Sequence, residues 1–290
     1  MKMPPTQTET LSFSAQWTSR TALFSAGILF AGLMAHRLLG MSTPITLNLI
    51  KLSMAGALVS LVLALFAMVR IWRKAGPGVP RIVTGVLLSL ALLSWPLSQY
   101  KAFTTLPQIN DITTDWKNPP QFIQLVHLRP LEANPTRYRG EVVAKLQRKA
   151  YPDLVGLNVN RSSIEAFEVA VEALKRRGIT IINEQVPGKT PDQPGLIEAY
   201  DRTLILGFYD DVAVRVSGNQ TRSRIDVRSA SRFGDHDLGQ NARRVRALLK
   251  EIVARLEASV PSARDHNQKK KKSKATTPGK KGKRKTRRRR

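Results

Sequence analysis

Two arginines and two serines occur within five consecutive residues in the C-terminal half of the chain. They are Arg228, Ser229, Ser231 and Arg232. The segment lies between a strand-like run and the expected start of a helix. Backbone N–H groups at a helix N-terminus and forked guanidinium groups both bind phosphate or carboxylate oxygens. Together with Asp211, Asp237 and Asn241, these residues are the predicted ligand site, and their chemistry favours an anionic ligand.

The same residues also allow a purely structural interpretation. Asp210, Asp211 and Asp226 could pair with the arginines instead of leaving them open to a ligand. Asp237 has the side chain of a helix N-cap, and Asn241 could tie the loop to the sheet. Asp210 and Asp211 are adjacent, so in a strand they point to opposite faces and form a poor acid/base pair.

Motifs of known catalytic sites are absent from the sequence. The Gly188-Lys189-Thr190 run lacks the leading glycine of a phosphate-binding loop, because that position holds Asn183. There is no Gly-x-Ser-x-Gly motif. The four histidines are scattered without metal-ligand spacing, and the absence of cysteine excludes thiolate chemistry and thiolate–zinc sites. We therefore expect no metal and no cofactor, and the catalytic residues of any enzymatic activity stay unidentified.

The elements that must position this site are expected to form an α+β domain over residues 161–260. Ser162 and Glu165 form a capping box, and apolar residues at helical spacing continue to Gly178. Strand-like runs follow at 179–184, 195–200, 204–209, 212–216 and 224–229. The last two alternate apolar and polar residues, which predicts an antiparallel sheet with one buried and one polar face. A final helix from Asp237 to Ser259 completes a domain of two layers.

The segment before this domain, residues 104–160, is rich in proline and asparagine. Its strongest breakers of regular structure are Asn118, Pro119, Pro120, Pro130 and Pro135. The segment is therefore predicted to be an extended lead-in with little regular structure.

A longer pattern surrounds the candidate site. Residues 210–216 read Asp-Asp-Val-Ala-Val-Arg-Val, and residues 224–244 read Arg-Ile-Asp-Val-Arg-Ser-Ala-Ser-Arg-Phe-Gly-Asp-His-Asp-Leu-Gly-Gln-Asn-Ala-Arg-Arg. With Asn110–Asp115 and Pro119-Pro120 upstream, residues 107–257 resemble the bacterial domain-of-unknown-function family 1499. The resemblance implies membrane spans before the domain, which members often carry, and it implies no particular activity because none is established for the family.

Three apolar stretches near the N-terminus are long enough to cross a membrane. They cover about residues 21–40, 50–70 and 81–99, each near the roughly 20 residues that a hydrocarbon core of about 30 Å requires. Residues 1–103 are therefore predicted to be a three-helix transmembrane anchor. The small residues Gly27, Ala31, Gly32 and Gly56 favour close packing of its helices.

The flanking charges predict the orientation of the anchor. The loop between the second and third spans is flanked by Arg70, Arg73, Lys74 and Arg81, whereas the loop between the first two spans has Arg37 and Lys51. The positive-inside rule places the second loop and the N-terminus in the cytoplasm. Because the number of spans is odd, we expect a multi-pass protein of the bacterial inner membrane with a periplasmic domain.

The net charge of +26 is concentrated outside the domain. Residues 104–263 carry 23 basic and 19 acidic residues, whereas the chain from Asn267 onward carries 14 Lys or Arg and no acid. This balance argues against nucleic-acid binding by the fold itself and predicts a disordered basic tail over residues 261–290.

The expected partners follow from the anchor and the tail. The anchor predicts the lipid bilayer, and Lys269–Arg290 could attract anionic lipid or an envelope polymer. Nucleic acid is a partner only if the tail is cytoplasmic. The leading hypothesis is an envelope-facing binding or structural module. The alternatives are an enzyme acting on an anionic envelope substrate and a cytoplasmic-facing nucleic-acid tether.

Overall fold

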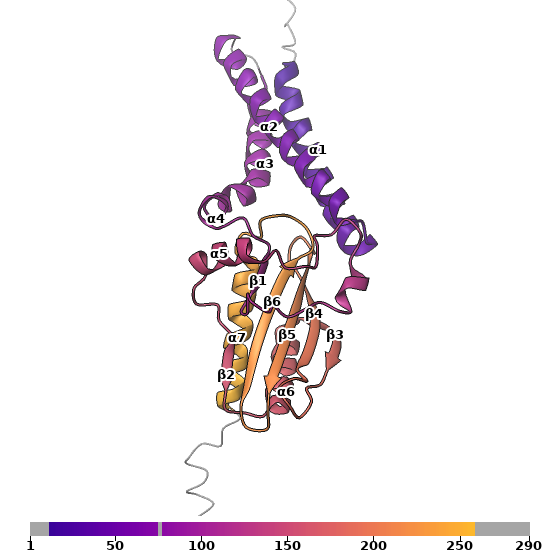
Figure 1. The fold of residues 1–290 in the computed structure, drawn as a ribbon. Helices are drawn as coiled ribbons and strands as arrows, with labels where there is room; N and C mark the ends of the chain where they lie inside the picture. Colours follow the sequence, from indigo (N-terminus) through magenta and orange to yellow (C-terminus); the bar gives the residue numbers. More distant parts are fainter. Residues whose placement is uncertain (1–11, 75–76, 259–290) are drawn as a thin grey trace, which may run out of the picture.

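The computed structural model describes residues 12–74 and 77–258, and it contains a bundle of long helices joined to one α+β domain (Figure 1). Both parts agree with the fold class predicted from the sequence. The predicted basic tail, including Lys269–Arg290, lies outside the described residues.

Three long helices form the anchor, and a short one leads from it to the domain. Their bounds are α1 Phe13–Leu39, α2 Thr43–Lys74, α3 Val79–Ser98 and α4 Tyr100–Thr105. The long helices are apolar and long enough to cross a membrane. All three begin before the predicted spans. α2 begins at Thr43, with Pro44 in its first turn, where proline is tolerated.

Small residues at the helix contacts allow close packing within the anchor. A Cβ atom on Gly56 would lie 2.1 Å from the Ser25 hydroxyl, and one on Gly32 would lie 3.0 Å from a methyl group of Leu49. Gly27 faces open space, so it does not serve this packing. Two serine hydroxyls of α2 also donate hydrogen bonds to backbone carbonyls of α1, at 2.7 and 2.8 Å.

The domain is built on one antiparallel sheet of six strands. The strands are β1 Asp111–Thr113, β2 Leu157–Val159, β3 Thr180–Gln185, β4 Gly195–Arg202, β5 Tyr209–Gly218 and β6 Ser223–Ser231. Their order is β1-β6-β5-β4-β3, and β2 also pairs with β6. β6 therefore lies next to three strands, and two of these come from the segment before residue 160.

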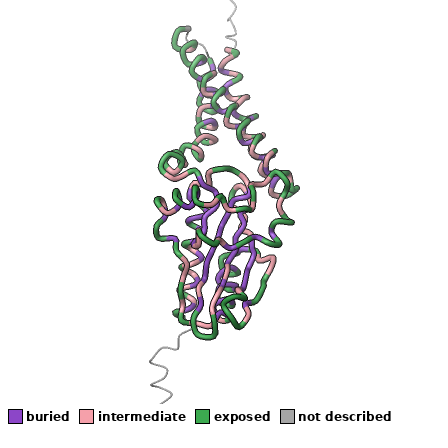
Figure 2. The backbone as a smooth tube through the Cα atoms, viewed as in Figure 1, coloured by how far each residue is buried: buried purple, intermediate pink, exposed green. Residues whose placement is uncertain are grey.

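Two helices cover one face of the sheet and enclose the core. α6 (Ser163–Arg176) and α7 (Gln240–Ala258) pack on this face, and the strands beneath them are buried along most of their length (Figures 1 and 2). Phe167 and Leu174 of α6 and Leu248 and Ile252 of α7 meet Val214 and its alternate neighbours. The helical and strand periodicities of the sequence thus converge on one apolar layer.

The segment at 104–160 is more regular than its prolines and asparagines predict. It supplies β1, β2, the short 3₁₀ helix Leu125–Leu128 and α5 (Glu141–Ala150). Ile112 and Leu154 are buried in the domain core, which explains why flanking breakers do not prevent these elements from forming. The segment is thus an integral part of the domain.

The strand-like run at 204–209 is, in contrast, the loop of the β4–β5 hairpin. β4 extends to Arg202 and β5 begins at Tyr209, so both strands are longer than predicted. Gly207 has a positive φ of 75°, and Leu204 and Ile205 are exposed. The run is apolar but has no core to cover it at this position, so its composition alone suggested a strand.

Candidate functional site

The structure brings the seven predicted site residues together around β6 but divides them between the two faces of the sheet. Ser229, Ser231, Asn241 and Asp237 lie on the side of α7. Arg228, Arg232 and Asp211 lie on the opposite side, beneath the coil that precedes α5. Because side chains alternate along a strand, neighbours in sequence belong to different clusters.

On the helix side, Asn241 and Arg244 connect the sheet to α7. The Ser229 hydroxyl donates to Asn241 Oδ1 at 2.7 Å, and Asn241 Nδ2 donates to the Ser231 hydroxyl at 2.9 Å. Arg244 donates to Asp210 at 2.6 Å and to Asp201 at 2.7 Å. The serines and the asparagine therefore satisfy one another inside the domain.

Asp237 stabilises the start of α7. Its carboxylate accepts hydrogen bonds from the backbone N–H groups of Gly239 and Asn241, each at 2.8 Å. Asn241 also donates to the Asn110 carbonyl at 3.0 Å, which fixes the first turn of α7 to the segment before β1. The helix cap by Asp237 and the link made by Asn241 are the roles that the structural interpretation of the sequence gave these residues.

On the opposite face, Arg228 is fully buried and forms a two-pronged ion pair with Asp111 of β1. The two hydrogen bonds measure 3.0 and 2.7 Å. The same guanidinium donates to the carbonyls of Pro120 and Thr136, and it lies over the Phe122 ring with its carbon 4.5 Å from the ring centroid. Arg228 thus ties β6, β1 and the covering coil together.

Asp211 occupies a second buried junction on this face. Its two carboxylate oxygens accept hydrogen bonds from Arg232 and Arg129. The arginines predicted to hold an anion are thus occupied by carboxylates of the same domain. The cluster therefore has a structural role, because its guanidinium groups donate to carboxylates inside the domain.

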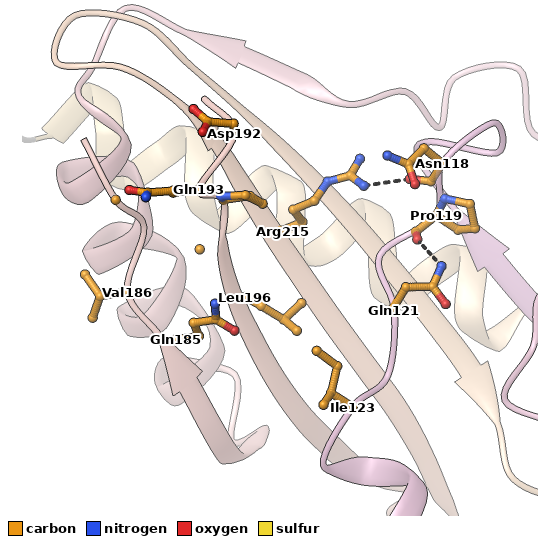
Figure 3. A pocket seen from close by; sticks show the side chains of 13 residues that line it. Asn118, Pro119, Gln121, Ile123, Gln185, Val186, Asp192, Gln193, Leu196 and Arg215 are labelled. Atoms are coloured by element: carbon orange, nitrogen blue, oxygen red, sulfur yellow. Dashed lines mark hydrogen bonds between the residues drawn. The ribbon is translucent and has the colours of Figure 1, made fainter. Parts of the chain in front are cut away.

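A groove of about 600 Å³ lies at the end of the sheet far from the anchor, between the β3–β4 loop and the coil at 118–123 (Figure 3). Four amide side chains line it: Asn118, Gln121, Gln185 and Gln193. Leu196 and Ile123 give it apolar surface, and Arg215 lies between the two walls. The groove therefore combines neutral hydrogen-bonding groups with one guanidinium.

Arg215 is held in place by the groove wall. It donates to the Asn118 carbonyl at 2.7 Å, to Asp115 at 2.8 Å and to Asp226 at 3.1 Å. Its Nε is buried and has no hydrogen-bond partner among the described residues. At the other wall, a hydrogen bond with the Thr190 side chain lowers the pKa of Asp192, an exposed carboxyl.

Most of the domain core and both sides of this groove lie in a part of the chain that matches one sequence-family model. Residues 111–252 match the family described as a protein of unknown function, DUF1499. The match confirms the resemblance predicted from the segment around Arg228. No curated protein matches the chain. We refer to residues 111–252 as the DUF1499 region.

Sequence reasoning offered the pairing of Asp211 and Asp226 with arginines as its structural interpretation, but it missed the coil that covers the polar face of the sheet. Alternation in the strands predicted a polar face, but it did not predict that a coil packs over that face. The coil at 114–136 covers it, so that Asp226, Arg228 and Glu198 are fully buried. The sequence did contain one signal for this cover. Asp111 lies in Asn110–Asp115, the upstream segment that takes part in the family resemblance.

Glu198 of β4 is the clearest of these missed residues. Its carboxylate accepts the backbone N–H groups of Ile123, Gln124 and Leu125 at 2.7 to 3.1 Å, and the side-chain amide of Asn183 at 3.1 Å. A carboxylate favours clustered N–H donors of this kind. Glu198 thus anchors the covering coil to the sheet.

Burial raises the pKa of several groups in the DUF1499 region. Desolvation raises the pKa of Asp210 despite its ion pair with Arg244, and it raises the pKa of Asp237 despite the two N–H groups that it caps. Burial likewise raises the pKa of Tyr138. Within residues 12–74 and 77–258, no group of His, Cys, Asp and Glu side chains has the arrangement of a metal site.

Proposed function

We propose that this protein is a multi-pass protein of the bacterial inner membrane whose DUF1499 region acts as a periplasmic binding module. The observation that carries the proposal is the position and lining of the groove. The β3–β4 loop, which forms one wall of the groove, lies at the end of the sheet opposite the anchor (Figure 1), so a tethered domain presents the groove away from the bilayer.

The distribution of cations supports the orientation. The end of the anchor that is remote from the domain carries Arg70, Arg73 and Arg81, whereas the domain end of the long helices carries Arg37 and Lys51. Excess positive charge marks the cytoplasmic side of a membrane protein. The charges therefore favour a domain on the opposite, periplasmic side.

The groove lining favours a ligand rich in amide and hydroxyl groups. Amide side chains both donate and accept hydrogen bonds, and they can pair with peptide groups or sugars without requiring a net charge. The apolar patch of Leu196 and Ile123 suits the less polar face of a sugar or a small side chain. A cell-wall polymer of N-acetylated sugars and short peptides combines these groups, and it is the ligand class that we propose.

The orientation is tested by fusing alkaline phosphatase or green fluorescent protein after Ala258, the last described residue. The phosphatase folds into its active form in the periplasm, whereas the fluorescent protein folds in the cytoplasm. We expect active phosphatase and dark fluorescent protein. Bright fluorescence with inactive phosphatase would contradict the periplasmic position and favour the nucleic-acid tether.

The ligand class is tested by sedimenting the detergent-solubilised full chain with purified peptidoglycan. Gln121→Ala combined with Gln185→Ala removes two exposed groove amides; if each hydrogen bond contributes about 1 kcal/mol, binding weakens roughly 30-fold. Gln124→Ala is the matched control, because it removes an exposed amide from the same coil outside the groove. Equal binding by the groove variant and the control would contradict the groove as the binding site.

A further inference from the structure

The β4–β5 loop carries two large apolar side chains at an exposed tip. Leu204 is 84% exposed and Ile205 is 69% exposed. They lie between Arg202, where β4 ends, and Tyr209, where β5 begins. Adjacent apolar side chains that are exposed on a domain indicate a contact surface when an apolar partner lies beside them.

The loop is bound to the end of transmembrane helix α1. Arg37 of α1 donates through Nη1 to the Leu204 carbonyl at 2.7 Å, and Arg202 donates back to the Arg37 carbonyl at 3.1 Å. The rings of His36 and Phe208 meet edge to face with centroids 5.3 Å apart. These contacts place the tip beside the point where α1 leaves the apolar part of the bilayer.

The surface around this point is itself apolar. α1 ends at Leu39, and Leu38 and Leu39 are 72% and 83% exposed. A cation such as Arg37 near the end of a span is typical of the membrane interface, where its charge reaches the head groups. The exposed tip of the β4–β5 loop therefore continues an apolar surface that the anchor already presents to lipid.

A second contact fixes the domain relative to the anchor. Phe103 of α4 stacks on His236 in the loop between β6 and α7, with centroids 5.4 Å apart and planes 21° from parallel. This loop and the β4–β5 loop both lie at the anchor end of the sheet (Figure 1). Two separate attachments hold this end toward the bilayer.

We propose that Leu204 and Ile205 insert into the lipid head-group region beside α1, so that the domain rests on the bilayer through its own loop. The partner is the phospholipid bilayer that surrounds the anchor. The proposal is independent of the groove and of the side of the membrane on which the domain lies.

The absence of cysteine allows a direct test. Ile205→Cys in the full chain is labelled with a nitroxide and reconstituted in phospholipid nanodiscs. Collisions of the label with oxygen, which concentrates in lipid, are compared with collisions with a water-soluble nickel chelate. We expect a ratio of oxygen to nickel collisions that is several-fold higher at position 205 than at an exposed site remote from the bilayer.

Two positions calibrate the measurement. Val186→Cys reports a water-exposed site, because Val186 is 61% exposed in the β3–β4 loop at the far end of the sheet. Leu58→Cys reports a lipid-facing site on α2, where Leu58 is 54% exposed. A ratio at 205 equal to that at 186 would overturn the proposal. Protection from both reagents would also overturn it, because protein would then cover the tip.

Discussion

Glu198 shows how a single buried carboxylate can hold a long coil on a sheet. Glu198→Ala leaves the backbone N–H groups of residues 123–125 without their acceptor. Hydrogen bonds to a charged group contribute about 1.5–3 kcal/mol each, so losing these contacts should cost roughly 3 kcal/mol or more in the free energy of unfolding. Trypsin should then cleave rapidly after Lys117 in the released coil, which mass spectrometry of the digest would detect.

Two further variants test whether this effect belongs to the carboxylate. Glu198→Gln retains one carbonyl acceptor and should lose less stability than the alanine variant. Glu184→Ala removes an exposed acid of β3 and should change stability by no more than about 0.5 kcal/mol. Slow cleavage of Glu198→Ala, at the rate of the Glu184 control, would show that other contacts hold the coil.

Asp237 and Asp153 should contribute to stability with opposite pH dependence. Burial raises the pKa of Asp237 above its ordinary 3.8, so its contribution is present below that value and lost as the pH rises through the raised pKa. The hydrogen bond from Arg246 lowers the pKa of Asp153, so its contribution is present above 3.8 and lost as the pH falls.

Asparagine substitutions isolate the two titrations, and asparagine also caps helices well. Relative to the unsubstituted protein, Asp237→Asn should become more stable as the pH rises above about 4, whereas Asp153→Asn should become relatively more stable as it falls below about 4. Thermal unfolding of the detergent-solubilised chain between about pH 3 and 7 measures both. Parallel pH profiles for the two variants would contradict the opposite shifts.

At the level of elements, apolar patterns in the sequence predicted the helices and strands that pack against apolar surface. They missed the segments that pack against the charged face of the sheet. The helix after Ser162 and the strands around Val214 and Val227 follow an apolar repeat, whereas the three spans are continuous apolar stretches. β1 and β2 have only three residues each, too few for a repeat to be visible. Their positions depend on long-range partners, and the pairing of Arg228 with Asp111 spans 117 residues.

This dependence predicts where the domain can be cut. A chain of residues 104–258 should fold and unfold cooperatively, whereas a chain of residues 161–258 lacks β1, β2 and α5 and should not. Removing Asp111 alone leaves the buried Arg228 charge unpaired, at a cost of about 3–5 kcal/mol, a large share of ordinary domain stability. Circular dichroism during heating distinguishes the outcomes. Cooperative unfolding of 161–258 would show that the segment before residue 160 is dispensable.

At the scale of the whole molecule, three parts carry different physical tasks. The anchor is apolar with cations at its flanks, the domain neutralises its charges internally, and the chain beyond residue 267 carries 14 basic residues and no acid. The ion pairs of the domain leave few arginines for a polyanion. Attraction to polyanions is therefore expected to reside in the chain beyond the domain.

A deletion of residues 267–290 tests this assignment on a heparin column. Polyanion affinity falls with salt in proportion to the charges that are neutralised, so the full chain should elute at much higher salt than the deleted chain. Deleting residues 259–266 is the control, because that stretch holds only Arg264 and Asp265 as charged residues apart from His266. Elution of the 267–290 deletion at the same salt as the full chain would assign polyanion binding to the domain or the anchor flanks. That result would return the exposed arginines of the domain to consideration as ligand contacts.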